Sequence, residues 1–126
     1  MFDSELVHEI LTNIAESLKK ISSRFEGVVI SDDFLLTPAG SEKLDSICMQ
    51  LIVIGESLKN VDKITEHKLL TKYPEIEWSK VKGLRDIISH HYFDINTEAI
   101  FDICQNKIPP LADIISRMIK DVDDLK

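Results

Sequence analysis

The stretch GLRDIISHHYF, residues 83–93, places several side chains that could do chemistry within about two helical turns. Arg85 can hold a phosphate through paired N–H donors and stabilise charge that builds on it. His90, a side chain that titrates near neutral pH, can take up or release a proton. RNA supplies its own nucleophile, the 2′-hydroxyl, so these groups suit cleavage of a phosphodiester without a metal ion.

Helical geometry decides which of these side chains can meet. Asp86 and His90 are four residues apart and share a face, so the carboxylate can accept the Nδ1 proton and favour the charged imidazole. Arg85 and Ser89 are related in the same way. His90, however, lies about 140° around the helix from Arg85. Both reach one substrate only if a groove wraps the helix end, if the helix unwinds there, or if a second copy faces the first.

A purely structural interpretation competes with this one. Arg85 and Asp86 could be ordinary surface charges of a helix, and His90 could cap its last carbonyl groups beside Tyr92. From the spacing alone, the structural interpretation is the better supported of the two.

The charge distribution also bears on function. A net charge of −7 disfavours broad electrostatic capture of nucleic acid, which depends on neutralising phosphates. Residues 78–93 are nevertheless locally basic, because Lys80, Lys82 and Arg85 face only one acid, Asp86, in that stretch. An anion is therefore expected here, and the two lysines are candidate phosphate contacts unless they are simply solvated.

The composition places the chain in a broad class. Its 126 residues, 44% hydrophobic and 29% charged, are typical of a single globular domain spanning residues 1–126. No stretch approaches the roughly 20 apolar residues that cross a bilayer. Cys48 and Cys104 lie among apolar neighbours, as buried reduced thiols of a cytosolic protein do. No metal-ligand spacing and no glycine-rich phosphate loop occurs, so neither a metal nor a cofactor is expected.

The hydrophobic periodicity predicts an all-α, up-and-down bundle of four to five main helices. Expected helices cover residues 4–25 with Ser4 as cap, 38–60, a short 65–73, the motif helix 77–90, one from 96 or 97, and a last from 109. Residues 28–40 are expected to be mainly a connector. The expected buried seam of the second helix is Leu44, Ile47, Leu51, Ile54, Leu58 and Val61, and that of the first is Leu6, Ile10, Ile14, Leu18, Ile21 and Phe25.

Four residues suggest how the motif helix is held. Gly55 and Gly83 fall inside expected helices at a cost of about 1 kcal/mol each, which close approach of helix backbones would offset. Trp78 is expected to anchor the start of the motif helix in the core. Glu56 could pair with Arg85 or be a plain exposed glutamate, and the second alternative is slightly favoured.

The motif and its flanks together resemble a known family. Arg85-x4-His90-x-Tyr92 is similar to the signature of the HEPN superfamily, specifically the HepT-like toxins of HepT/MntA toxin–antitoxin systems, which are of type VII. Further segments resemble family segments in the same order, and the resemblance covers about residues 44–120. These segments are IGESLKN at 54–60, YPEIEWSKVKGLRD at 73–86, HHYFDIN at 90–96 and IPPLADII at 108–115.

The resemblance implies a fold and a reaction. The fold is a helical domain that forms a homodimer, in which the motif helices of two subunits line a shared cleft. The reaction is metal-independent cleavage of RNA, in which Arg85 and His90 act on the scissile phosphate and 2′-hydroxyl attack leaves a cyclic phosphate. Asp86 fills a position that is commonly polar, often asparagine, and with Ser89 it is expected to support the site. An acid there opposes substrate binding unless it pairs with Arg85 or His90.

The resemblance also implies a partner and a modification. A MntA-like nucleotidyltransferase antitoxin would transfer AMP units from ATP to Tyr92, and the anionic adduct would repel RNA from the cleft. His91 is expected to be a bystander. A cytoplasmic toxin regulated in this way is the preferred interpretation. A non-catalytic helical subunit that binds a nucleotide or a nucleotidyltransferase is the main alternative, and a purely structural adaptor would leave the motif unexplained.

Overall fold

A computed structural model describes residues 2–90 and 96–125 of the chain, without the side chains of residues 89 and 90. The described part contains helices and connecting turns and no strand, which confirms the all-α prediction. Its elements are α1 Ser4–Phe25, η1 Ser31–Phe34, α2 Pro38–Ile64, η2 Leu70–Lys72, α3 Trp78–Lys82, α4 Leu84–His90, α5 Thr97–Asp102, η3 Ile103–Lys107 and α6 Ile108–Asp123. No helix within the described ranges is long and apolar enough to cross a membrane.

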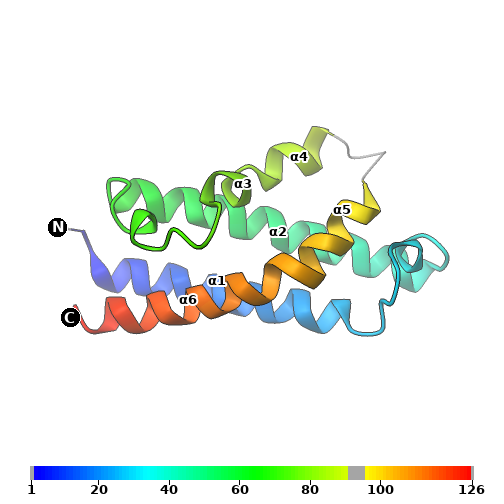
Figure 1. Cartoon of the computed structure of the whole chain (residues 1–126), viewed down its shortest axis with the longest axis horizontal. Helices are drawn as coiled ribbons and strands as arrows, with labels where there is room; N and C mark the ends of the chain where they lie inside the picture. Colours follow the sequence, from blue (N-terminus) through cyan, green and yellow to red (C-terminus); the bar gives the residue numbers. More distant parts are fainter. Residues whose placement is uncertain (1, 91–95, 126) are drawn as a thin grey trace.

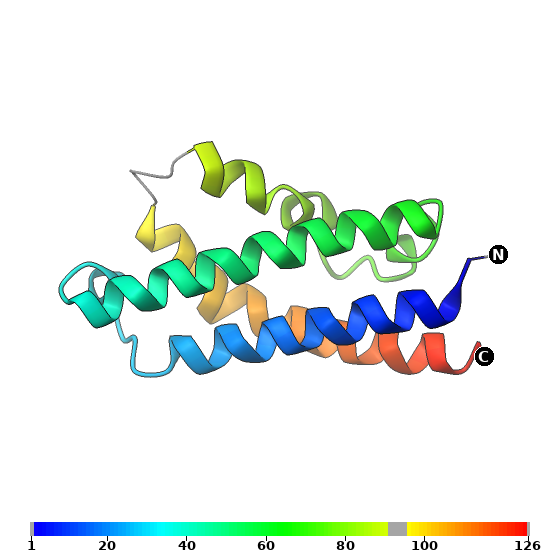
Figure 2. The same ribbon diagram turned by 180° about the vertical axis from the view of Figure 1, so that it is seen from behind.

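The main helices run up and down along one long axis (Figures 1 and 2). The chain passes outward along α1, returns along α2, goes out again through α3 and α4, and comes back through α5, η3 and α6. The two ends of the chain therefore lie at the same end of the bundle. Extensive packing of α1 against both α2 and α6 forms the core, while α3 and α4 pack on α2.

The two long helices follow the predicted periodicity, with two corrections. The expected seam of α2 is entirely buried, and α2 runs one turn further than predicted, to Ile64. The first helix is capped by Asp3, whose side chain accepts a hydrogen bond from the Leu6 amide, and not by Ser4. Its buried face differs at the start, because Leu6 is exposed and Ile10 is only partly buried. The fully inward residues are Val7, Leu11, Ile14, Leu18 and Ile21.

Trp78 anchors the start of the motif helix in the core, as predicted. The Trp78 indole is buried and donates to the carbonyl oxygen of Tyr73 at 2.9 Å. Tyr73 is buried in turn, and its hydroxyl donates to Asp121 of α6 at 2.6 Å, while the Arg117 guanidinium lies over its ring. Burial and the Asp121 hydrogen bond raise the pKa of Tyr73 to about 12. The segment before α3 is thus fixed to the opposite helix of the bundle.

The expected continuous motif helix is in fact two short helices. Helix α3 ends at Lys82, Gly83 follows as its cap, and α4 begins at Leu84. Gly83 also does not lie at a close approach to another helix, because an added Cβ would meet only carbonyls of its own turn. The expected helix over residues 65–73 is a turn followed by the short η2, and Thr65 caps the end of α2 instead.

The last two expected helices form one continuous element. Asn96 caps α5 as predicted, since its side chain accepts from the Ala99 amide at 3.1 Å. The five-residue π-helix η3 then carries the chain directly into α6, so residues 103–107 do not interrupt the helix. Pro109 and Pro110 sit in the first turn of α6, where their missing N–H groups leave no donor unpaired.

The two cysteines are buried free thiols, as predicted. Burial raises the pKa of Cys48 to about 11 and that of Cys104 to about 12, with smaller contributions from Asp45 and from Cys48 respectively. Because the thiolate is the reactive form, both residues are chemically inert parts of the core.

Candidate functional site

The motif residues lie on α4, which rests on α2 through its apolar side. Leu84 and Ile88 are buried, whereas Arg85, Asp86 and Ile87 are exposed. These three residues are consecutive, so their side chains point in different directions around the helix instead of forming one stripe. The Arg85 guanidinium and the Asp86 carboxylate are therefore exposed to solvent, on a helix whose apolar side packs against α2.

Arg85 makes a specific contact with the neighbouring helix. Its Nη1 donates to Oε1 of Glu56 on α2 at 2.6 Å. The hydrogen bond from Arg85 holds the pKa of Glu56 below its usual range, and the same bond raises the pKa of Arg85. Both groups are therefore charged at neutral pH. Of the two alternatives left open for Glu56, the structure selects pairing with Arg85, although the sequence slightly favoured a plain exposed residue.

Several predicted site residues fall at the edge of the described part. His90 is the last residue of α4, and neither its side chain nor that of Ser89 is described. The predicted roles of His91 and Tyr92 lie outside the described residues. The expected pairing between Asp86 and His90 therefore stays a prediction.

The two lysines of the basic stretch are both engaged in ion pairs. Lys80 lies 3.2 Å from Glu77 one turn earlier, at the exposed surface. Lys82 donates to Oδ2 of Asp62 on α2 at 2.8 Å. Lys80 can therefore exchange its exposed ion-pair partner readily, whereas Lys82 helps to fix α3 to α2.

Asp62 is a buried carboxylate that the sequence reasoning missed. It is only 5% exposed, and the same Oδ2 that accepts from Lys82 also accepts from Nδ1 of His67 at 2.7 Å. Burial raises the pKa of Asp62, but the hydrogen bonds and charges of Lys82 and His67 outweigh this and lower it overall. Only a weak signal in the sequence marks Asp62 as buried. It directly follows the seam residue Val61, on a face of the helix that looks solvated.

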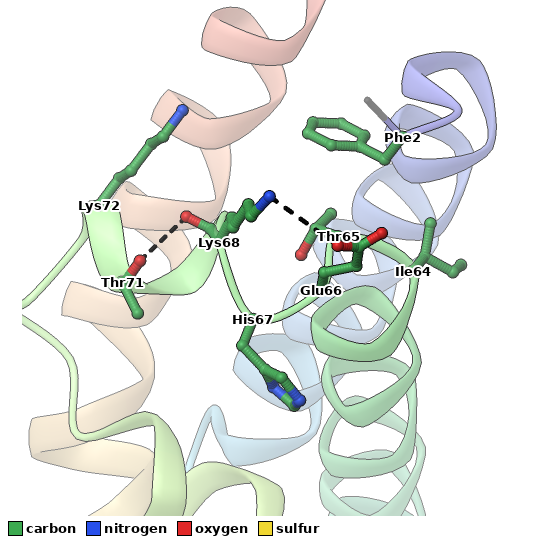
Figure 3. Close-up of a pocket in the computed structure, with 8 residues that line it drawn as sticks. All are labelled: Phe2, Ile64, Thr65, Glu66, His67, Lys68, Thr71 and Lys72. Carbon is green, nitrogen blue, oxygen red and sulfur yellow. Dashed lines mark hydrogen bonds and ion pairs between the residues drawn. The ribbon is translucent and has the colours of Figure 1, made fainter.

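A depression lies where α2 ends, beyond Asp62 (Figure 3). Its volume is about 450 Å³, and its wall includes Phe2, Ile64, Lys68 and Thr71. Glu66 and His67 both have positive φ, which costs energy for residues with a side chain. In Figure 3 the His67 ring points away from Phe2, and Lys68 reaches toward Glu66 at 3.8 Å.

An apolar groove of about 470 Å³ lies on the inner side of the motif segment. It separates α3 and α4 from η3 and α6, and α2 forms its floor. The apolar residues that line it are Leu51, Ile54, Ile76, Val81, Leu84, Ile87, Ile103, Ile108, Pro110 and Leu111. Leu84 and Ile87 flank Arg85 and Asp86 in sequence, so the groove and the exposed charges share one short helix.

Comparison with known proteins places the chain in a family. Residues 14–118 match the model of the family described as Ribonuclease HepT-like. A candidate RNase of Methanocaldococcus jannaschii is 35% identical over 117 residues, which is 93% of this chain and 90% of the relative. A candidate ribonuclease HepT of Thermococcus cleftensis is 27% identical over 112 residues, covering 89% of this chain and 94% of the relative.

A candidate RNase of Caldanaerobacter subterraneus is 24% identical over 110 residues, 87% of this chain and 91% of the relative. No solved structure matches the chain significantly. The family model spans most of the sequence, including α4, and the Methanocaldococcus jannaschii relative is 35% identical with 90% of its length covered. The chain belongs to the HepT-like ribonuclease family.

Proposed function

We propose that the chain is an RNA endonuclease and the toxin of a type VII toxin–antitoxin system. The observation that carries the proposal is the sequence Arg85-x4-His90, which occupies the exposed helix α4 in a chain of the HepT-like ribonuclease family. The relatives named as candidate RNases or as a candidate ribonuclease HepT support the same activity.

The proposed reaction needs only groups of the chain and of the RNA. The 2′-oxygen attacks the adjacent phosphorus, the bond to the 5′-oxygen breaks, and a 2′,3′-cyclic phosphate and a free 5′-hydroxyl result. Arg85 would hold the phosphate and stabilise the charge that builds on its oxygens. His90 would transfer the proton, which leaves the 2′-hydroxyl and is needed on the 5′-oxygen. Asp86 and Ser89 would support this pair from the same helix.

Lys80 and Lys82 on α3 are proposed RNA phosphate contacts. Lys80 is the more available of the two, since an exposed ion pair contributes little and exchanges readily for a phosphate. Lys82 is the less available of the two, because the buried Asp62 holds it and offsets its charge.

A homodimer is part of the proposal. Met49 and Val53 on α2 are 58% and 40% exposed, and they lie about two turns and one turn before Glu56, respectively, on the same side of the helix. Half-buried Ile52 adjoins them, and we call these three residues the Met49–Val53 face. A second copy that covers this face would bring its own motif helix near the first. It would also answer the geometric difficulty that Arg85 and His90 lie on different sides of one helix.

The proposed regulation is covalent and involves a cytoplasmic partner. A MntA-like nucleotidyltransferase antitoxin would transfer AMP from ATP to the Tyr92 hydroxyl and release pyrophosphate. Each AMP unit adds a negative charge two residues from His90, which would repel RNA and fill its site.

Expression with paired substitutions tests the activity. The unmodified chain is expected to arrest growth in a bacterial host, whereas Arg85→Ala and His90→Ala are not. RNA from arrested cells is expected to carry new cyclic phosphate ends. Arrest that persists in both variants would refute the nuclease.

A non-catalytic subunit that binds a nucleotide or a nucleotidyltransferase is the second candidate. The net charge of −7 and the two acids next to Arg85, Glu56 and Asp86, favour it, because they oppose capture of a polyanion. No growth arrest and no RNA cleavage by the purified chain, together with stable binding of the nucleotidyltransferase, would support this alternative.

A further inference from the structure

The contact between Glu56 and Arg85 is part of a three-residue network. One carboxylate oxygen of Glu56 accepts from Arg85 Nη1 at 2.6 Å, and the other lies 3.3 Å from Nζ of Lys59. Both oxygens are therefore held by cations, which fixes the orientation of the carboxylate. Two cations share the single Glu56 carboxylate, and Asp86 beside Arg85 offsets the remaining positive charge of this network.

The backbone around Glu56 is as closely determined as its side chain. Gly55 lets the carbonyl of Val81 approach α2 so closely that an added Cβ would lie 2.8 Å from that oxygen. Lys82, the next residue, donates to Asp62 of α2. The segment that leads into Arg85 is thus pressed against α2 at Gly55 and tied to it two turns later. The backbone positions of Glu56 and Arg85 are therefore fixed relative to each other.

Arg85 keeps the capacity to bind a second anion while Glu56 holds it. A guanidinium carries five N–H donors, and Glu56 takes one of them at Nη1. The Arg85 side chain is 57% exposed, so a ligand can reach it from solvent. A free arginine side chain on the surface samples many rotamers, and a guanidinium held at one nitrogen samples far fewer.

We propose that Glu56 is a positioning residue of the ribonuclease site, which fixes the Arg85 guanidinium so that its remaining donors meet the scissile phosphate. This inference rests on the proposed function of Arg85. An exposed ion pair contributes little to folding, so its main effect is on geometry. Donors that are already oriented stabilise transition-state charge without reorganising during the reaction.

Steady-state cleavage of a fluorophore–quencher RNA oligonucleotide of mixed sequence tests the proposal. Glu56→Ala is expected to lower kcat by about tenfold and to change KM by less than about twofold, because orientation matters most in the transition state. Glu56→Asp keeps a carboxylate one methylene shorter and is expected to recover part of kcat.

The chain provides a matched control in Glu75 and Arg117. These residues form an ion pair at 2.7 Å with side-chain exposures of 48% and 50%; Glu75 precedes α3, and Arg117 lies on α6. Glu75→Ala removes an equivalent ion pair and is expected to leave kcat unchanged. If Glu56→Ala behaves like Glu75→Ala, the positioning role is wrong. A rise in activity in Glu56→Ala would overturn it too, since the carboxylate would then compete with the phosphate.

A second measurement separates this inference from the proposed function. In ¹⁵N NMR spectra, the Arg85 Nε–H group is expected to become more mobile on the ps–ns time scale in Glu56→Ala, and that of Arg117 in Glu75→Ala. Equal Arg85 mobility with and without the Glu56 carboxylate would overturn the positioning role even if no RNA is cleaved. Cleavage at the wild-type rate by Arg85→Ala would instead refute the proposed function.

Discussion

The carbonyl oxygen of Val81 faces Gly55 so closely that a Cβ on that glycine would lie 2.8 Å away. Such a distance is shorter than real Cβ contacts allow, and the opposing atom belongs to a backbone that cannot rotate away. Leu84 follows on the same side, with its Cβ 3.8 Å from the same position. Because Gly55 has no side chain, α3 and α4 can pack closely against α2. This close packing brings Glu56 within reach of Arg85.

Gly55→Ala is expected to destabilise the protein although alanine favours helix. The gain in helix propensity is about 1 kcal/mol, whereas forcing α3 away from α2 costs about 1–3 kcal/mol and disturbs the packing of Leu84. Urea denaturation should therefore show a lower free energy of unfolding. Asn60→Ala, at an exposed position of the same helix, is the control and should change the free energy of unfolding by less than about 0.5 kcal/mol. An equal effect of the two substitutions would contradict the close-packing explanation.

The long helices could be predicted because their burial is periodic. The seam from Leu44 to Val61 repeats every three or four residues, and all of its members are buried in α2. The buried face of the first helix is harder to predict, because both Leu6 and Val7 fit an apolar stripe. Only packing against α2 and α6 selects Val7. Periodicity identifies a helix reliably, but its exact buried face depends on neighbours that are distant in sequence.

The interruptions of the helices could not be predicted in the same way. The sequence predicts Gly83 in the interior of a helix at a close approach, yet it separates α3 from α4, while Gly55 makes the close approach. Both glycines lie in helical sequence, and only the neighbouring backbone distinguishes them. Pro109 and Pro110 fit the first turn of a separate last helix, but the π-helix η3 joins α5 to α6 directly.

The candidate site was recognised from a local motif, but its supports are non-local. Arg85 and His90 are close in sequence, so their spacing alone drew attention to them. Glu56 is 29 positions from Arg85, and Asp62 is 20 positions from Lys82. Contacts at such separations depend on how α3 and α4 pack on α2. They cannot be predicted from the spacing of residues within one helix.

Asp62 should make stability depend on pH in a defined direction. Its folded-state pKa is below the ordinary 3.8, so the ionised carboxylate stabilises the fold above that value, and the contribution is lost as pH falls through the folded-state pKa. Asp62→Asn is expected to lower the free energy of unfolding by about 1–3 kcal/mol at pH 7, because Lys82 and His67 lose a charged acceptor. The difference from wild type should shrink at pH 3.

Urea denaturation of both proteins at the two pH values measures this dependence. Asp45→Asn, which removes an exposed carboxylate from the same helix, serves as the control and should have little effect at either pH. A loss of stability in Asp62→Asn that is the same at pH 7 and pH 3 would show that packing, and not the charge of Asp62, is responsible.

The Met49–Val53 face should control assembly. If a second copy covers it, Val53→Glu places a charge in the interface and should weaken dimerisation by about a hundredfold or more. Light scattering after size-exclusion chromatography should then show a monomer, and RNA cleavage should fall with dimer concentration. Leu36→Glu adds the same charge at an apolar residue that is 72% exposed on the connector between η1 and α2, and it should leave the dimer intact. A monomeric wild type, or a dimeric Val53→Glu, would contradict the proposed interface.

Modification of Tyr92 is the most direct prediction about regulation. After incubation with ATP and a nucleotidyltransferase encoded beside the chain's gene, the intact mass should increase by one or more AMP units, and Tyr92→Phe should remain unmodified. The other tyrosine of the chain, Tyr73, is an internal control, because it is buried and its hydroxyl is bonded to Asp121. Peptide mapping should therefore place the adduct on Tyr92 and leave Tyr73 unchanged. An adduct that persists in Tyr92→Phe would assign the modification to another residue, and an unchanged wild-type mass would remove adenylylation from the proposed function.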